Sequence, residues 1–155
     1  MFLFIFIFLI CFLYSSEIKV YFTSPNNTPS IENPFKGIDF ALKEFIDSAN
    51  FGDTIYLCIY QINNSTITSA IDDAVRRKVK VYAIFDDKTS LDLFATNFER
   101  KKMPSDIVMH NKFVVLKSSK VWSGSYNFTV SATYSQNNFA LEIFSKELAE
   151  IYEKA

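Results

Sequence analysis

The stretch HNKFVVLKSSKVWSGSYNFT, residues 110–129, holds the only histidine of the chain, a lysine two residues later and a Gly-Ser-x-Asn sequence. Apolar runs on either side of Lys117 predict two antiparallel strands, residues 107–116 and 120–123, joined by a turn at residues 117–119. Residues two apart in a strand face the same side. The pattern therefore predicts that His110 and Lys112 project together, and that the Gly-Ser-x-Asn turn follows the next strand.

Outward from this stretch, strand and helix patterns alternate. Apolar runs predict strands in EIKVYFTSP, TIYLCIYQI, VKVYAIFDD and FALEIF, the second and third of which are typical of buried strands. Helical spacing predicts helices from a cap at Asn33-Pro34 to about residue 48, from Ile67 to the basic cluster at residues 76–78, over a short piece at 91–98, shortly after Asn127, and in the C-terminal KELAEIYEKA. The stretch ERKKMPSD is predicted to be a loop. This order indicates an α/β fold, with a mixed β-sheet flanked by helices.

The composition fits one globular domain. The chain has 155 residues, of which 49% are hydrophobic, and a formal net charge of −1, so its overall charge gives no sign of a nucleic-acid partner. Its two cysteines exclude a disulfide framework and a Cys-rich zinc site.

The first residues form a separate segment. MFLFIFIFLICFLY is apolar and carries no Lys or Arg, and its length of about 14 residues is short of the roughly 20 that cross a bilayer. We therefore predict that residues 1–16 are a signal peptide or an N-terminal membrane anchor. The domain then spans residues 17–155, and the protein is exported, to the periplasm or beyond, or is membrane-anchored.

The opening stretch gathers groups that suit an anion. An imidazole beside the ammonium of Lys112, a hydroxyl from Ser125 and an amide from Asn127 would form a site for phosphate. A histidine can act there as a nucleophile or move a proton. A lone histidine in an apolar strand also fits a hydrogen-bonded core residue, and the residue types by themselves leave both interpretations open.

The spacing of these residues adds a resemblance. The chain is similar to the phospholipase D superfamily, whose signature is H-x-K-x4-D-x6-G-S-x-N, and it most resembles the small single-motif branch of Nuc-type endonucleases and relatives of mitochondrial cardiolipin hydrolase. Five positions match at the family spacing: His110, Lys112, Gly124, Ser125 and Asn127. The resemblance implies the phospholipase D/nuclease-like fold.

The same resemblance implies a two-step mechanism without metal or other cofactor. One histidine attacks phosphorus and forms a phosphohistidine, while a second histidine protonates the leaving oxygen. Lys112 and Asn127 would bind the nonbridging oxygens, with Ser125 also in the catalytic group and Gly124 and Asn138 near the substrate. Because the chain has a single histidine, we predict a homodimer in which two copies of His110 form one composite active site.

Two positions depart from the family pattern. Lys117 stands where the signature has aspartate, at the end of the predicted strand, and we interpret it as a supporting position. Asn138 stands where small members often carry a glutamate that orients the catalytic histidine. It could accept a hydrogen bond there but lacks the charge that stabilises an imidazolium. Glu142, four residues further on, has the wrong spacing to replace it.

Several substrates and sites follow as hypotheses. The first is a non-specific endonuclease acting on DNA or RNA. The alternatives are a phospholipase D-type hydrolase of anionic phospholipid that associates with a membrane, and a catalytically impaired homologue that binds nucleic acid or lipid. A magnesium site at Asp86-Asp87 is a weaker hypothesis. The basic clusters at residues 76–78 and 100–102 would guide a polyanion if both flanked the site.

Overall fold

The computed structural model describes residues 17–26 and 37–155. The predicted leader at residues 1–16 and the predicted helix cap at Asn33-Pro34 lie outside the described residues. The described part of the first helix begins at Ile38, with Gly37 at its N-cap.

A seven-stranded sheet forms the centre of the molecule, with the strand order β1-β7-β6-β5-β2-β3-β4. Strands β2, β3 and β4 are parallel to one another, and every other neighbouring pair is antiparallel. The strands are β1 (Glu17–Phe22), β2 (Thr54–Ile59), β3 (Lys80–Phe85), β4 (Glu99–Lys102), β5 (Lys112–Leu116), β6 (Lys120–Gly124) and β7 (Phe139–Phe144). This confirms the predicted mixed sheet.

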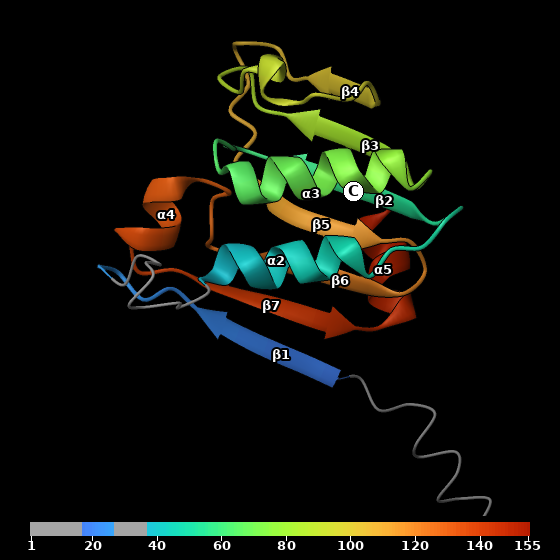
Figure 1. Cartoon of the computed structure of the whole chain (residues 1–155), viewed down its shortest axis with the longest axis horizontal. Coiled ribbons are helices and arrows are strands. Elements are labelled where there is room, and N and C mark those ends of the chain that lie inside the picture. The colour runs from blue at the N-terminus through green and yellow to red at the C-terminus, as the bar shows by residue number, and fades with distance from the viewer. Residues whose placement is uncertain (1–16, 27–36) are drawn as a thin grey trace, which may run out of the picture.

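Helices α2 (Ile38–Asp47) and α3 (Ser65–Arg76) cover one face of the sheet (Figure 1). Their apolar sides pack on alternate residues of the central strands, and Trp122 lies fully buried in this core. Helix α5 (Lys146–Tyr152) packs on the opposite face over β5 and β6, where Ala149 contacts Val115 and Val121. Helix α4 (Val130–Tyr134) follows the Gly-Ser-x-Asn turn, as predicted. No helix of the described residues is both long and apolar enough to span a bilayer.

Three local predictions were wrong. The charged stretch ERKK is strand β4 rather than a loop, because its backbone pairs with β3 at the sheet edge. The predicted helix at residues 91–98 is only the short 3₁₀ turn Leu91–Leu93. The strand predicted to begin at residue 107 begins at Lys112, so His110 precedes β5 instead of lying within it.

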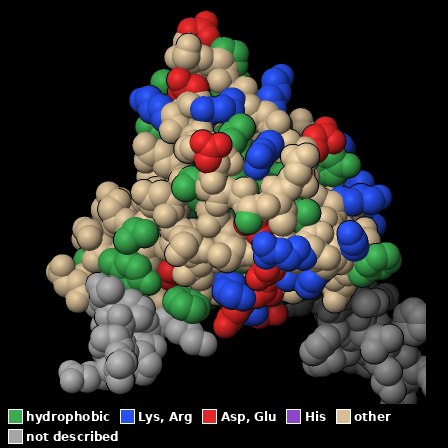
Figure 2. Space-filling view, turned by 45° about the horizontal axis from the view of Figure 1, so that its top comes forward, with side chains coloured by type: hydrophobic (Ala, Val, Ile, Leu, Met, Phe, Trp, Pro, Cys, Tyr) green, Lys and Arg blue, Asp and Glu red, His purple; other side chains and the backbone are tan. Residues whose placement is uncertain are grey.

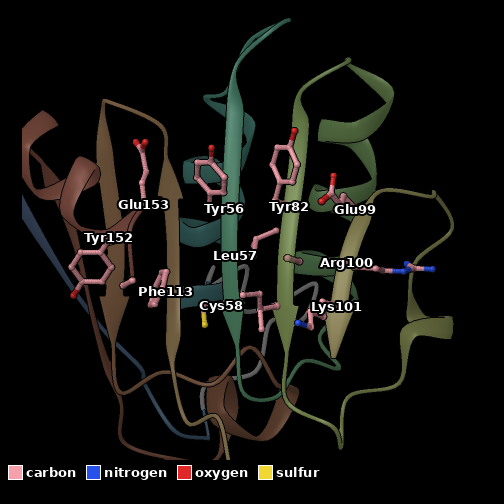
Figure 3. Close-up of a pocket in the computed structure, with 13 residues that line it drawn as sticks. Tyr56, Leu57, Cys58, Tyr82, Glu99, Arg100, Lys101, Phe113, Tyr152 and Glu153 are labelled. Carbon is pink, nitrogen blue, oxygen red and sulfur yellow. The ribbon is translucent and has the colours of Figure 1, made fainter. Parts of the chain in front are cut away.

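The face of the sheet beside α5 carries a groove of about 390 Å³. Figure 3 shows Tyr56 and Tyr82 side by side in it, from β2 and β3, with ring centroids 5.5 Å apart. Cys58 lies further along β2 in the same groove. His110, Lys112, Ser125 and Asn127 do not line this groove, which is therefore distinct from the predicted phosphate site.

Candidate active site

The predicted site residues lie along the edge of the sheet that is formed by the ends of its strands, where β2 and β6 end and β5 begins. Lys112 pairs with Ile59 at the end of β2, and Phe113 pairs with Ser123 next to Gly124. In Figure 1 this edge lies on the side of α4. The antiparallel β5–β6 pair thus brings the His110–Lys112 segment beside the Gly-Ser-x-Asn turn, although 11 residues separate Lys112 from Gly124 in the chain.

His110 is exposed and contacts an aromatic ring. The ring of Tyr60, just after β2, lies edge-on to the imidazole with the centroids 4.6 Å apart. Lys112 places its ammonium 5.0 Å from the centre of the same ring and donates a hydrogen bond to the backbone carbonyl of His110 at 2.8 Å. Tyr60 therefore holds the two charged or ionisable side chains together. The sequence pattern gives no sign of this role, because Tyr60 ends the apolar run TIYLCIY, which is typical of a buried strand.

Ser125 and Asn138 form a second part of the site. The Ser125 hydroxyl lies 3.1 Å from Asn138 Oδ1, to which it donates, and it accepts a hydrogen bond from the Phe139 N–H at 3.1 Å. Asn138 also donates from Nδ2 to the carbonyl of Ala132 at 3.1 Å. The amide of Asn138 thus links Ser125 to the middle of α4. This is a different use from the contact with histidine considered from the sequence.

Gly124 has a packing reason to be glycine. A Cβ atom at this position would lie 2.4 Å from the carbonyl oxygen of Phe139 and 2.8 Å from Cα of Ala140, both in β7. Such distances are far inside van der Waals contact. The missing side chain lets β6 and β7 approach at the point where the chain turns toward Ser125.

The turn that carries Asn127 is held by backbone and buried side-chain bonds. Phe128 donates to the carbonyl of Gln61 at 3.1 Å and accepts from the N–H of Asn63 at 3.1 Å. The buried Tyr126 hydroxyl lies 2.7 Å from that of Thr133, and burial is the main cause that raises the pKa of Tyr126. Asn127 Oδ1 is buried and has no hydrogen-bond partner among the described residues, which leaves its acceptor capacity unused.

Lys117 and Glu142 lie away from this edge. Lys117 is exposed and directly follows the last residue of β5. Because a strand rises about 3.3 Å per residue, Lys117 lies about 16 Å from Lys112 at the beginning of the strand. Glu142 is buried in β7 and accepts a hydrogen bond from Lys120. The structure thus places both side chains where the sequence interpretation expected them, outside the phosphate site.

The remaining charged candidates separate in space. Arg76 pairs with Asp73, and Arg77 pairs with Asp47, at the end of α3 far from the site. Of the two basic clusters, the one at residues 100–102 in β4 extends to the strand ends where the site lies, because Lys102 pairs with Phe85, the last residue of β3. Figure 2 shows Lys and Arg side chains interspersed with Asp and Glu on the visible face. The two basic clusters therefore do not flank one groove.

Asp86 takes part in backbone hydrogen bonds rather than in a carboxylate cluster. Its Oδ2 accepts the N–H of Met109 at 3.0 Å, and its Oδ1 accepts the N–H of Lys88 at 3.3 Å. Within residues 17–26 and 37–155, no three His, Cys, Asp or Glu side chains are grouped so that they could hold a metal ion.

Comparison with known proteins identifies the family. Residues 42–155 match the family model described as "Cardiolipin synthase, PLD-like domain". The match covers most of the chain, and the chain therefore belongs to the phospholipase D superfamily, as its signature residues predicted.

The relatives that this chain resembles in sequence are named phospholipase D. The chain is 29% identical over 136 residues to the phospholipase D of Rickettsia prowazekii, which covers 83% of this chain and 65% of that protein. It is 32% identical over 114 residues to the phospholipase D of Rickettsia conorii, covering 69% of this chain and 56% of that protein. The chain thus spans about half to two thirds of the length of these relatives.

Solved structures show the same fold. Nuc from Salmonella typhimurium, a phospholipase D family member, superposes with a TM-score of 0.74 at 21% identity and covers 90% of this chain and 91% of its own. NucT from Helicobacter pylori superposes with a TM-score of 0.67 at 15% identity, covering 90% of this chain and 92% of its own. At these identities the likeness concerns the fold.

Proposed function

We propose that this chain hydrolyses phosphodiester bonds through a phosphohistidine at His110, and that its substrate is nucleic acid cleaved without sequence preference. The observation that supports this proposal is that the His110–Lys112 segment and the turn that carries Ser125 and Asn127 lie at the same end of neighbouring strands in a phospholipase D fold. An imidazole nitrogen of His110 attacks phosphorus, and the bond to the leaving oxygen breaks as that oxygen takes a proton from an acid. Water then attacks the phosphohistidine and releases the second product.

The other side chains stabilise charge. The ammonium of Lys112 and the amide of Asn127 supply a cation and hydrogen bonds for the nonbridging oxygens, where negative charge grows in the transition state. Neither group changes its covalent state. The buried Oδ1 of Asn127 without a partner would become useful only if a donor from a substrate or a second chain approached it.

The test is a substrate panel. Protein lacking residues 1–16 is incubated with single-stranded DNA, duplex DNA, RNA and cardiolipin vesicles, each with EDTA. We expect cleavage of the nucleic acids in the presence of the chelator. Turnover of cardiolipin alone would instead establish the phospholipase alternative, which the names of the curated relatives favour. Binding without turnover would identify a catalytically impaired homologue.

The acid that protonates the leaving oxygen is proposed to be His110 of a second copy of the chain. Several exposed apolar side chains surround the site and form what we call the apolar rim: Phe22, Ile107, Val108, Val130 and Phe139. Ile107, Val108 and Val130 lie within three residues of a site residue in the chain. The Phe139 N–H donates to Ser125, and Phe22 pairs with Phe139 in the sheet. A second copy seated on this rim would cover apolar surface and bring two His110 side chains together.

Mixing experiments test this composite site. Wild-type chains and His110→Ala chains are refolded together in varying ratios, and activity is plotted against the wild-type fraction. If one site needs two wild-type chains, an equal mixture retains about one quarter of the activity, because only about a quarter of random dimers are fully wild type. A control mixture with Lys117→Ala chains retains almost all of it. A linear response to His110→Ala chains would contradict the composite site.

The pH dependence should report Lys112. Partial burial lowers the pKa of the Lys112 ammonium from its ordinary value of 10.5, since less polar surroundings favour the neutral amine. The ammonium is the form that binds phosphate, so kcat/KM is expected to fall as the pH rises through this lowered pKa. In Lys112→Arg the guanidinium stays charged, and the alkaline decline assigned to Lys112 should disappear even if the maximum rate is lower. An unchanged decline in this variant would assign it to another group.

A further inference from the structure

Asp86 is a buried carboxylate beside the candidate active site. It follows the last residue of β3 and is only 1% exposed. Its own N–H donates to the carbonyl of Ile59 at 3.1 Å, and its carbonyl accepts the N–H of Thr89 at 3.2 Å. The backbone of Asp86 is thus tied to the end of β2, next to Tyr60, and its side chain is held in one place.

The side chain of Asp86 reaches the residue that precedes His110. Its Oδ2 accepts the N–H of Met109 at 3.0 Å, in a buried hydrogen bond. Burial by itself would raise the pKa of Asp86, but the N–H groups of Lys88 and Met109 outweigh it and lower the pKa. The carboxylate is therefore ionised near neutral pH, and a charged acceptor makes a strong hydrogen bond.

Few hydrogen bonds hold the backbone of the segment that carries His110. Residues 103–111 contain neither helix nor strand. Near the histidine, Met109 Sδ lies 3.4 Å from the Cys58 thiol, and the carbonyl of Asn111 accepts the N–H of Tyr60 at 2.8 Å. Among these contacts, the hydrogen bond from Met109 to Asp86 is buried and has a charged acceptor. It fixes the position of the backbone one residue before His110.

We infer that Asp86 is a positioning residue that places the His110 imidazole for attack on phosphorus by holding the Met109 N–H. This inference deepens the proposed function and rests on it. Asp86 touches neither the imidazole nor the reacting phosphorus, so its effect passes through the backbone of residues 109–110. A displacement of about 1 Å at a reacting group can lower a rate about 10²-fold.

Asp86→Asn is the informative variant. It keeps the shape of the side chain, but an amide cannot accept from both the Met109 and the Lys88 N–H, because one of its two ends is itself a donor. We expect kcat to fall about 10²-fold, with KM changing less than about threefold because the groups proposed to bind phosphate are untouched.

A spectroscopic signal of the nucleophile provides a readout other than activity. The chain has one histidine, so a ¹H–¹³C spectrum of labelled imidazole contains one Cε1–H signal, from His110. In Asp86→Asn we expect this signal to shift or broaden, because the backbone that carries the imidazole is no longer held in one position. If Asp86 only supported another part of the fold, the His110 signal of the variant would be the same as in the wild-type protein.

Asp72→Asn is the matched control. Asp72 is also a buried carboxylate that accepts two backbone N–H groups, from Ala95 and Thr96, each at 2.9 Å. Its hydrogen bonds lower its pKa against the effect of burial, as they do for Asp86. The loop that it holds contains no proposed site residue, so Asp72→Asn should change stability without changing the His110 signal or kcat.

The outcomes separate the two proposals. An unchanged His110 signal and unchanged kcat in Asp86→Asn would overturn the positioning role, and so would equal changes in Asp72→Asn. Asp86→Glu serves as a second variant, since it keeps the charge but lengthens the side chain. If both Asp86 variants lost the dispersed amide spectrum of the folded protein, Asp86 would be a global support and the inference would fail. A wild-type protein inactive on every phosphodiester overturns the proposed function, whereas the His110 signal still tests the positioning.

Discussion

Replacing His110 by alanine is expected to lower phosphodiester turnover by about 10⁴-fold or more, because the variant lacks the proposed nucleophile and its proton carrier. The fold should be retained, since the imidazole is exposed and its described ring contact is with Tyr60 at the surface. The measurement is the cleavage rate of whichever substrate the panel identifies, together with acid-labile ³²P trapped on the protein. Wild-type protein should retain label and His110→Ala should retain none.

A lysine elsewhere on β5 supplies the control for this prediction. Lys117→Ala changes an exposed side chain at the far end of the strand and is expected to keep activity within about twofold, as most surface substitutions affect the fold little. Lys112→Ala, at the site end of the same strand, should lower the rate by about 10²-fold or more through lost charge stabilisation. Comparable losses in both lysine variants would contradict the placement of the site at the His110 edge.

Replacing Lys120 by methionine is expected to destabilise the protein by about 3–5 kcal/mol, because it leaves the buried Glu142 carboxylate with no cation nearer than the half-exposed Lys19 ammonium at 4.0 Å. Lys120 is 6% exposed and Glu142 5% exposed, and their charged atoms are 2.6 Å apart. Glu142 also accepts from the Tyr21 hydroxyl at 2.9 Å. Burial, and then this bond, raise the pKa of Tyr21 to about 12. Urea unfolding followed by circular dichroism measures the loss.

Two further variants make this prediction specific. The double variant Lys120→Met/Glu142→Leu removes both charges and should recover most of the lost stability, since apolar replacements of a buried pair are often neutral. Lys43→Met breaks the partly exposed pair between Lys43 and Asp47 and should cost less than about 1 kcal/mol. The Lys120 ammonium also lies 4.4 Å from the ring centre of Phe45 and 5.1 Å from that of Phe144. A double variant as unstable as Lys120→Met would show that lost contacts with these rings, rather than the unpaired carboxylate, dominate the loss of stability.

The predicted fold agreed with the structure where local patterns are strong. The apolar runs of β2, β3 and β7 and the spaced apolar residues of α3 are each visible in a short window, and all of them formed as predicted. Strand β4 was missed because its four residues are all charged. They form a strand because β3 offers an unpaired edge, where charged side chains remain in water.

The start of β5 shows the opposite error. The residues Ile107, Val108 and Met109 look like the beginning of a strand, yet the backbone there is irregular. The Met109 N–H bonds the side chain of Asp86, which lies 23 residues earlier, instead of a neighbouring strand. A side chain from a distant strand end thus diverted a segment whose local pattern favoured a strand, and no local window contains that competition.

By itself, the sequence determined the class of fold and the family, and it predicted four of the side chains that we propose to form the site: His110, Lys112, Ser125 and Asn127. Their spacing places them at the facing ends of an antiparallel strand pair, and that geometry is local. Only the tertiary structure decided that Tyr60 lies against His110, that Asp86 holds Met109, and that Asn138 orients Ser125. Tyr60 and Asp86 reach the His110 segment from β2 and β3, and the order of strands in the sheet sets those distances. That order follows from burying the core on α2 and α3, a property of the whole chain rather than of any stretch within it.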